Sequence, residues 1–162
     1  MTLLENPDNN PCFGCGPKHP RGLRLQFSRE RLPDGREAVV TTYTPQADEI
    51  GWPGLFHTSL HFMVLFEACY WAALELGGKV HVATGPQTFD QKRLPRVGQP
   101  FRAWAVLVPG APEGQLQVFA QSEMADGRVC ATLTSTFRPE SRARIEKAGL
   151  PLPQYLLDDM AP

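Results

Sequence analysis

The sequence predicts an α+β protein in which an antiparallel β-sheet curves around one long, buried α-helix. Three observations support this fold class: one helical stretch that is apolar on nearly every face, six stretches with the pattern of strands, and short turns that join strands in hairpins. The chain has 162 residues, about one ordinary domain. With 42% hydrophobic and 20% charged residues, it has the composition of a soluble globular protein that can bury a core.

Two strands are predicted before the helix. Apolar residues alternate with polar ones over residues 23–29, which is typical of a half-buried strand. The turn Leu-Pro-Asp-Gly at 32–35 leads into a second strand over residues 37–43, so the two form a hairpin. Residues 1–22 are rich in Pro, Gly and Asn and predict an irregular lead-in, and residues 44–54 predict a loop.

The long helix is predicted over residues 55–76. Its side chains are hydrophobic in nearly every direction, which is typical of a helix surrounded by protein. The stretch is almost long enough to span a bilayer, but His61, Glu67 and Glu75 lie inside it, and charges at bilayer depth are costly. We therefore expect a buried helix, no membrane contact, and a C-cap formed by the two glycines that follow.

Four further strands complete the predicted sheet, the last two joined by an Asp-Gly turn that is typical of hairpins. A helix wrapped by such a sheet is the hotdog architecture, which we assign to residues 1–139, with a short charged helix and a tail over 140–162. A sheet of this kind leaves an open edge, which predicts a homodimer or a homotetramer. The four strands are predicted over residues 80–92, 101–108, 115–124 and 128–138.

Three stretches of the chain resemble the hotdog thioesterases of the PaaI-like group. CFGCGPKHPRGLRL at 12–25 is similar to a lead-in of the form CFGCGPxNPxGLxL. GWPGLFHTS at 51–59, followed by EACYWAA at 67–73, is similar to GWPGxxHGG…DEAxxWAA, and residues 89–101 are similar to a strand ending in rPvpvGep. This resemblance implies hydrolysis of a small or medium acyl-CoA thioester, with CoA as part of the substrate and no cofactor.

The resemblance also implies roles for residues at the start and middle of the helix. His57 is retained, whereas the glycines that usually follow it are Thr58 and Ser59, whose backbone N–H groups are the expected oxyanion donors. The usual position of the catalytic acid holds Phe66, and the next residue is Glu67, which is rotated by about 100° around the helix. Two hypotheses stay open: hydrolysis with Glu67 as general base assisted by His57, or a non-catalytic protein that binds acyl-CoA.

Four other residues are candidates for contacts with the substrate. His61 lies one turn beyond His57, and it belongs either to a remodelled pocket or to the protein interior. Asp90 lies on the third predicted strand, where the PaaI-like group lines its cleft, so it could substitute for the missing carboxylate. Arg93 and Arg96 could hold the phosphates of CoA by charge-assisted hydrogen bonds.

The four cysteines predict reduced thiols and no metal site. The N-terminus lacks the pattern of a signal peptide, so we expect a cytoplasmic protein without disulfides. Cys12, Cys15 and His19 offer three of the four ligands that a structural zinc needs, and Cys69 and Cys130 lie in core elements. We interpret the Cys-x-x-Cys segment as a compact turn with inward-facing thiols. The net charge of -1 argues against a nucleic-acid interface.

Overall fold

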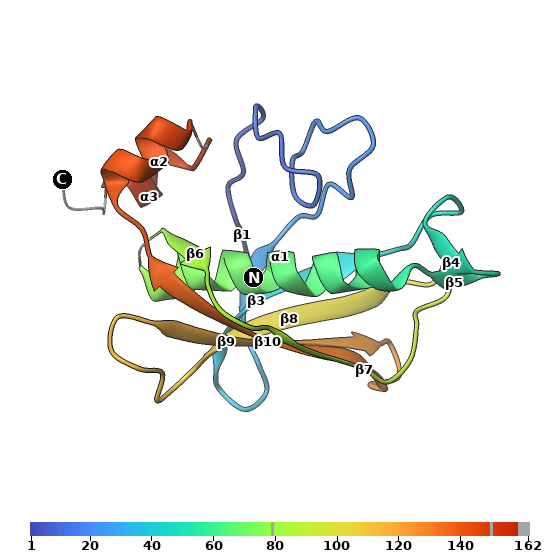
Figure 1. Ribbon diagram of the computed structural model, residues 1–162. Coiled ribbons are helices and arrows are strands. Elements are labelled where there is room, and N and C mark those ends of the chain that lie inside the picture. Colours follow the sequence, from blue (N-terminus) through green and yellow to red (C-terminus); the bar gives the residue numbers. More distant parts are fainter. Residues whose placement is uncertain (79, 150, 159–162) are drawn as a thin grey trace.

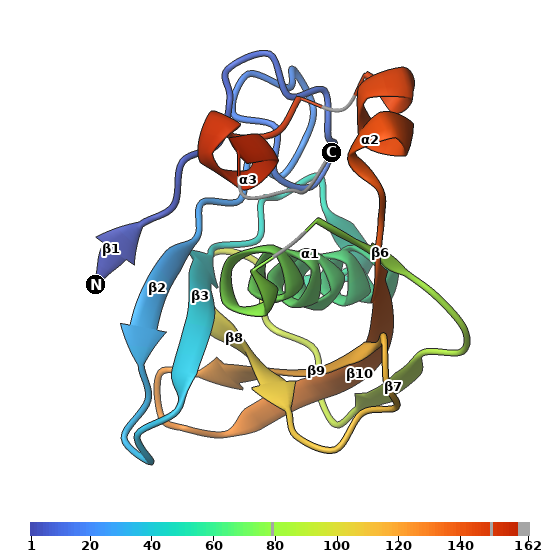
Figure 2. The ribbon, with the colours of Figure 1, turned by 90° about the vertical axis from the view of Figure 1, so that its left-hand side faces the viewer.

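An eight-stranded antiparallel sheet curves around the central helix α1, Thr58–Gly77, in the computed structural model, which describes residues 1–78, 80–149 and 151–158 (Figures 1 and 2). The strand order is β1-β2-β3-β8-β9-β10-β6, and β7 also pairs with β10. The predicted α+β hotdog fold is confirmed. The strands of this sheet are β1 Thr2–Leu3, β2 Ser28–Arg31, β3 Glu37–Tyr43, β6 His81–Ala83, β7 Thr88–Gln91, β8 Phe101–Val108, β9 Leu116–Met124 and β10 Val129–Pro139.

Helix α1 begins three residues later than predicted. Leu55–Phe56 is strand β5, which pairs with β4, Ile50–Trp52, in a small separate sheet, so these residues are unable to join the helix. His57 is the N-cap residue, and its Nδ1 accepts a hydrogen bond from the Ser59 N–H at 3.1 Å. At the other end Gly78 is the C-cap with φ of 68°, a left-handed conformation that favours glycine.

The helix is the centre of the hydrophobic core, as its composition predicts. Val64, Leu65 and Ala68 are fully buried, and they pack in one cluster with the inner face of the sheet, for example Phe101 and Leu133. By length and composition α1 could cross a membrane, but 56% of its most apolar window is buried inside the protein. The sheet therefore provides the apolar environment that this helix requires.

The strand predicted at 23–29 is wrong for most of its length. Leu23, Leu25 and Phe27 are buried in alternation, as predicted, but the ladder begins only at β2. The N–H groups of Leu23 and Leu25 instead donate to the carbonyls of Phe13 and Gly14, both at 2.9 Å. Arg24, between them, has φ of 52°, which breaks the extended backbone. Residues 23–27 thus belong to the N-terminal segment that folds over α1.

The strand predicted at 80–92 is also corrected, because it is two short strands. Gly85 has φ of 73° and is followed by Pro86, and this bend separates β6 from β7. Both strands pair with the same edge of β10, so their outer edges have no partner strand among the described residues. Strands β3, β8, β9 and β10 agree with the predictions to within a residue at each end.

The C-terminal segment packs against the end of α1. Helices α2, Arg142–Ala148, and α3, Gln154–Asp158, bury Ile145 and Leu156 in a small cluster with Leu74 of α1. Together with the N-terminal segment they lie on the side of α1 that faces away from the sheet (Figure 2). The charged helix predicted after β10 is therefore present. The predicted tail includes residues 150 and 159–162, which lie outside the described residues.

Candidate functional site

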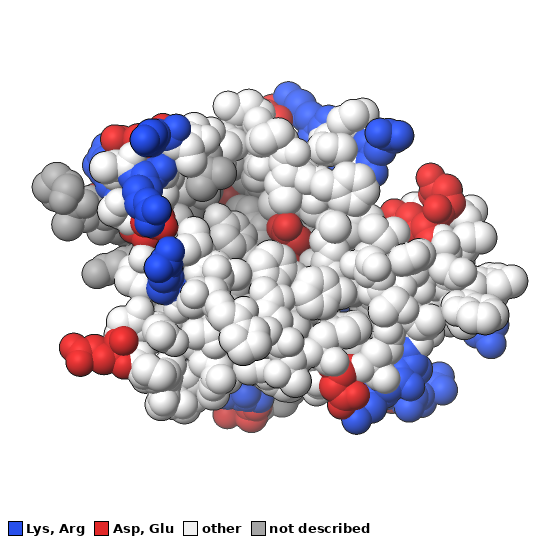
Figure 3. Space-filling view, in the orientation of Figure 1, with Lys and Arg blue, Asp and Glu red and all other residues white. Residues whose placement is uncertain are grey.

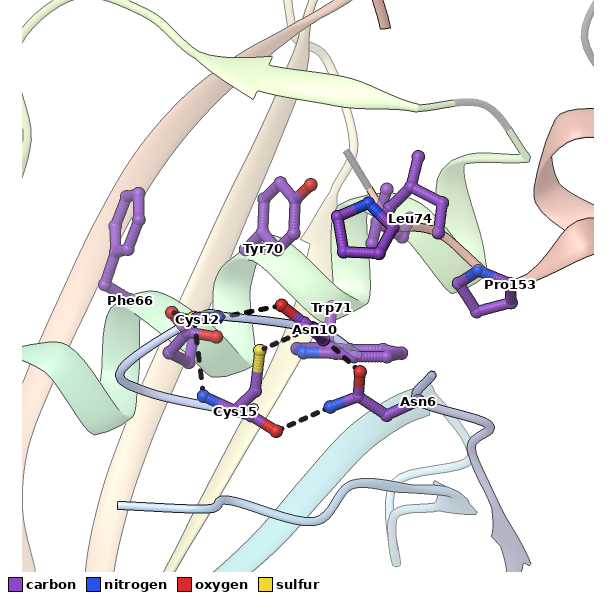
Figure 4. Close-up of a pocket in the computed structure, with 12 residues that line it drawn as sticks. Asn6, Asn10, Cys12, Cys15, Phe66, Tyr70, Trp71, Leu74 and Pro153 are labelled. Atoms are coloured by element: carbon purple, nitrogen blue, oxygen red, sulfur yellow. Dashed lines mark hydrogen bonds between the residues drawn. The ribbon is translucent and has the colours of Figure 1, made fainter. Parts of the chain in front are cut away.

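The Cys-x-x-Cys segment folds into a tight loop over the middle of α1, and we call residues 12–16 the Cys loop. The Gly16 N–H donates to the Cys12 carbonyl at 2.8 Å, and the Cys15 backbone N–H donates to Cys12 Sγ at 3.4 Å. Asn6 anchors the loop from outside, because its Nδ2 donates to the Cys15 carbonyl at 2.6 Å (Figure 4). The sequence predicts a compact turn with inward-facing thiols for this segment, and these hydrogen bonds form such a turn.

Two glycines let the Cys loop lie directly on Glu67 of α1. A Cβ on Gly14 would lie 2.6 Å from Glu67 Cγ, Cδ and Oε1, and a Cβ on Gly16 would lie 2.4 Å from the Asn10 carbonyl. Any larger residue at these positions would have to displace its neighbours. The glycines of the lead-in therefore have a steric role, which is to bring Cys12 and Cys15 down to the helix.

Glu67 is a buried carboxylic acid that is only partly hydrogen-bonded. Glu67 is 8% exposed. Its Oε1 accepts a hydrogen bond from the Cys12 thiol at 3.3 Å, and its Oε2 has no hydrogen-bond partner among the described residues. Burial raises the pKa of Glu67 to about 8. Hydrogen bonds from Cys15 lower the pKa of Cys12 to about 5, whereas contact with Cys12, together with burial, raises the pKa of Cys15. The three groups thus titrate as one coupled cluster.

Glu67 lies in the wall between two cavities. The first, which we call the Cys-loop cavity, has a volume of about 250 Å³, and Figure 4 shows its residues. The second, of about 280 Å³, is lined by part of the Cys loop and by residues nearer the start of α1, among them Ser59, Phe62, Met63 and Phe66. Apart from Glu67, the Cys-loop cavity is lined by Asn6, Asn10, Cys12, Cys15, Phe66, Tyr70, Trp71, Leu74, Pro151, Leu152 and Pro153.

Phe66, at the usual position of the catalytic acid, is part of an aromatic row. Its ring stacks on Phe62 at 6.1 Å between centroids and on Phe137 of β10 at 6.3 Å. Glu67, one residue later, faces the Cys loop instead. The two neighbouring residues therefore point in different directions, as the 100° rotation along a helix requires.

The predicted oxyanion donors are not close to Glu67 within one chain. The Ser59 N–H is already bonded to His57, and His57 and Thr58 are exposed to solvent. Glu67 lies eight residues after Ser59, which is about 12 Å along a helix. His57 therefore has the structural role of a helix cap, and its predicted catalytic role would need substrate or a second chain to connect it to Glu67.

Arg93 and Arg96 do come together, in a cavity beside the start of α1 that we call the arginine pocket. Its volume is about 240 Å³, and Arg128 is a third arginine in its wall. Arg128 forms an ion pair with Asp126 at 2.6 Å, whereas Arg93 and Arg96 form no ion pair within 4 Å in the described part of the chain. Other residues of the wall are Leu55, Leu94, Gln99 and Met124.

His61 and Asp90 are outside both the Cys-loop cavity and the arginine pocket. His61 is fully buried, with Nε2 at 2.8 Å from Ser122 Oγ and Nδ1 at 3.1 Å from the Gln91 side chain. Burial lowers its pKa to about 4, so it is a neutral interior histidine, the second of the two possibilities that the sequence left open. Asp90 is exposed and paired with Lys92 at 2.6 Å. Contacts of either residue with substrate stay a prediction.

The structure adds a grouping that the sequence analysis missed. The sulfur atoms of Cys12 and Cys15 and a carboxylate oxygen of Glu67 all lie within 4.8 Å of one another. His19, considered as a ligand from the sequence, instead packs edge-on against the Phe13 ring at 5.2 Å. Fifty-five residues separate Cys12 from Glu67, so spacing alone was unable to show this contact. In the sequence, only the glycines at 14 and 16 indicated that the backbone of this segment lies very close to other atoms.

Comparison with known proteins supports the fold. No family model matches the chain, and no curated protein matches its sequence. Many solved structures are similar, and three of them serve as examples. A thioesterase superfamily protein has a TM-score of 0.67 at 21% identity, over 80% of this chain and 60% of its own. The E. coli PaaI protein from the phenylacetic acid degradation operon has 0.58 at 17%, over 64% and 73%. A hypothetical thioesterase from Streptococcus pneumoniae TIGR4, with coenzyme A, has 0.59 at 15%, over 70% and 87%.

These similarities show that the protein has a hotdog fold. Among hotdog-fold proteins, the arrangement of its sheet and helix is that of the PaaI-like thioesterase group. The chain spans 60% of the length of the thioesterase superfamily protein that it matches. All three identities are below 25%, so the comparison establishes the fold, and the chemistry has to be argued from the residues.

Proposed function

We propose that this protein hydrolyses the CoA thioester of a small apolar acyl group, with Glu67 as the general base. One observation carries the proposal: the carboxylate of Glu67 lies in the wall of two cavities and has one oxygen without a hydrogen-bond partner among the described residues. A buried polar atom without a partner is costly to stability, so it is a good candidate for a functional group.

The proposed reaction needs only a base and a water molecule. Glu67 takes a proton from water, and the water oxygen attacks the thioester carbonyl carbon. The C–S bond then breaks, and the sulfur leaves and takes up a proton, which gives a carboxylic acid and free CoA thiol. The apolar walls of the Cys-loop cavity exclude other water and strengthen electrostatic interactions at the carbonyl.

The Cys-loop cavity and the arginine pocket fit the two ends of such a substrate. The aromatic rings of Phe66, Tyr70 and Trp71 in the Cys-loop cavity suit a small apolar acyl group. The arginine pocket suits the phosphates of CoA, because guanidinium groups bind phosphate through paired hydrogen bonds. The Streptococcus pneumoniae protein of similar fold contains coenzyme A, which supports this choice of substrate.

We further propose that two copies of the chain form the complete site. Glu67 and the start of α1 are too far apart to act on one carbonyl within a single chain. The open edge of β6 and β7 could pair with the same edge of a second copy. Light scattering coupled to gel filtration tests this, and a monomer at assay concentration would contradict it. A homotetramer also stays a prediction.

A second candidate function is acyl-CoA binding without hydrolysis. Two observations favour it: Phe66 replaces the usual acid, and the Ser59 N–H is occupied by His57. A protein with these features retains the cavities but lacks two parts of the usual chemistry. The binding hypothesis predicts that acyl-CoA raises the melting temperature while no thiol is released.

A panel of acyl-CoA substrates with a thiol-detecting reagent separates the two functions. For metal-free wild-type protein we expect thiol release, and for Glu67→Gln a loss of roughly 10²–10⁴-fold in kcat. Glu75→Gln is the matched control, since Glu75 lies on the same helix and accepts a hydrogen bond from Tyr155 away from the cavities. Wild-type activity that survives in Glu67→Gln would rule out Glu67 as the base.

A further inference from the structure

We infer that Cys12, Cys15 and Glu67 form a binding site for a thiophilic divalent cation such as Zn²⁺. This inference does not depend on the proposed hydrolysis, because it concerns the ligand atoms and not the substrate. It also departs from the sequence analysis, which predicts no metal site because it finds too few ligands. The third ligand comes from the middle of α1 and not from the lead-in.

The spacing of the three ligand atoms fits a tetrahedral ion. All three atoms lie within 4.8 Å of one another, and Cys12 Sγ is 3.3 Å from Glu67 Oε1. Zn–S bonds of about 2.3 Å and tetrahedral angles place two sulfur ligands about 3.8 Å apart. The three side chains therefore need only small rotations to close around an ion.

Each sulfur atom of the cluster accepts a hydrogen bond from an N–H group of the Cys loop or of Asn10. Cys12 Sγ accepts the Cys15 backbone N–H at 3.4 Å, and Cys15 Sγ lies 3.7 Å from Asn10 Nδ2, which donates to it. Such outer-shell donors orient metal ligands and stabilise their negative charge. The partnerless Oε2 of Glu67 is a second, independent observation, since this buried oxygen would gain a partner from a bound cation.

The backbone holds the two cysteines in place before any ion binds. The Cys12 N–H donates to Asn10 Oδ1 at 2.9 Å, and Asn6 holds the Cys15 carbonyl. Gly14 leaves the space through which Glu67 reaches the sulfur atoms. Pre-positioned ligands lose little conformational freedom on binding, which raises affinity.

The cluster offers three protein ligands and a cavity for the fourth. Cys12, Cys15 and Glu67 all line the Cys-loop cavity, so a water molecule or a small ligand can complete a tetrahedral ion from that side. Three protein ligands with one open position are typical of zinc sites that bind exchangeable ligands, and the two sulfur ligands favour zinc over magnesium or calcium. A bound ion would also occupy the carboxylate that we propose as the base.

Cobalt titration of the full-length chain is the direct test. Protein stripped with a chelator and kept in a non-thiol reductant is titrated with Co²⁺, which reports its ligands by absorption. We expect one ion per chain, sulfur-to-cobalt charge-transfer bands and the visible bands of a tetrahedral ion, all removed by Zn²⁺. A spectrum of octahedral cobalt, or no saturable binding, would overturn the inference.

Variants identify the ligands. Cys12→Ala and Cys15→Ala should each weaken Co²⁺ binding by more than about 100-fold, beyond the roughly 10–100-fold that changes to outer-shell partners cause. Glu67→Gln should keep the charge-transfer bands but alter the visible bands. Cys130→Ala is the matched control, because Cys130 is a buried thiol on β10 outside the cluster. Retained affinity in both cluster cysteine variants would contradict the site, whatever the control shows.

Adding Zn²⁺ to the hydrolysis assay keeps this inference separate from the proposed function. If both are right, one equivalent of Zn²⁺ inhibits the metal-free enzyme, since the cation and the water proton compete for Glu67. If the cobalt spectrum appears and hydrolysis is unaffected or stimulated by Zn²⁺, the metal site stands and Glu67 is not the base. If hydrolysis depends on Glu67 and no cobalt binds, the proposed function stands and the metal site fails.

Discussion

The Cys-loop cavity lies on the middle of α1, whereas the arginine pocket lies beside the residues that precede the helix, and the two differ in how exposed their charged groups are. In the first, the Glu67 carboxyl group of α1 and the Cys15 thiol are buried, and the Cys12 thiol beside them is partly exposed. In the second, Arg93 and Arg96 are exposed at the start of α1 and keep their hydration. Charged side chains gather at the margins of the face seen in Figure 3, and its centre is largely uncharged.

This difference separates chemistry from recognition. Electrostatic interactions are strong where water is excluded, so the state of one buried oxygen on Glu67 has large consequences. Exposed arginines contribute less per contact, because solvent screens them. We therefore expect changes in the Cys-loop cavity to affect the rate or the fold, and changes in the arginine pocket to affect the affinity for CoA.

The core that both regions share provides the largest expected effect on stability. His61, between the helix start and Glu67, has a folded pKa of about 4 against an ordinary value of 6.5. The contribution of neutral His61 to the free energy of unfolding is therefore fully present above pH 6.5. It is lost as the pH falls toward 4, and the total loss is about 3 kcal/mol. Urea unfolding of wild type and His61→Asn across this range measures it. Equal pH slopes in the two proteins would show that His61 has the same pKa in the folded and unfolded states, which would contradict the prediction.

The sequence predicted the shared core well and the Cys-loop cavity poorly. Helix α1 and strands β3, β8, β9 and β10 follow from local hydrophobic patterns, which the sheet then satisfies. Leu23 and Leu25 also have the pattern of a strand, but their N–H groups bond to the Cys loop, a tertiary contact that periodicity does not encode. The contact between Cys12 and Glu67 has the same origin, since it depends on how the lead-in folds back over the helix.

Two glycine substitutions compare the packing of the Cys loop with that of the exposed strand β4. Gly14→Ala should destabilise the protein by about 1–3 kcal/mol, because the new Cβ would lie 2.6 Å from buried Glu67 atoms. Gly51 lies on the exposed strand β4, and the Cβ of Gly51→Ala would lie 3.3 Å from His57. This substitution should lower the free energy of unfolding by less than about 1 kcal/mol. Neither glycine has a positive φ, so the comparison is steric. Unfolding curves measure both, and equal losses would contradict the tight fit of the Cys loop on α1.

The smallest expected effect belongs to the arginine pocket. Arg93→Ala combined with Arg96→Ala should raise KM for an acyl-CoA by roughly 10-fold and leave kcat unchanged, because these side chains would contact the phosphates equally before and during reaction. The same acyl group on N-acetylcysteamine, which carries no phosphate, should be hydrolysed equally by wild type and variant. Arg21→Ala combined with Arg31→Ala removes two exposed positive charges outside the pocket and is the control for general surface charge. If KM rises for both thioesters alike, the two arginines shape the fold near α1 and do not bind CoA phosphates.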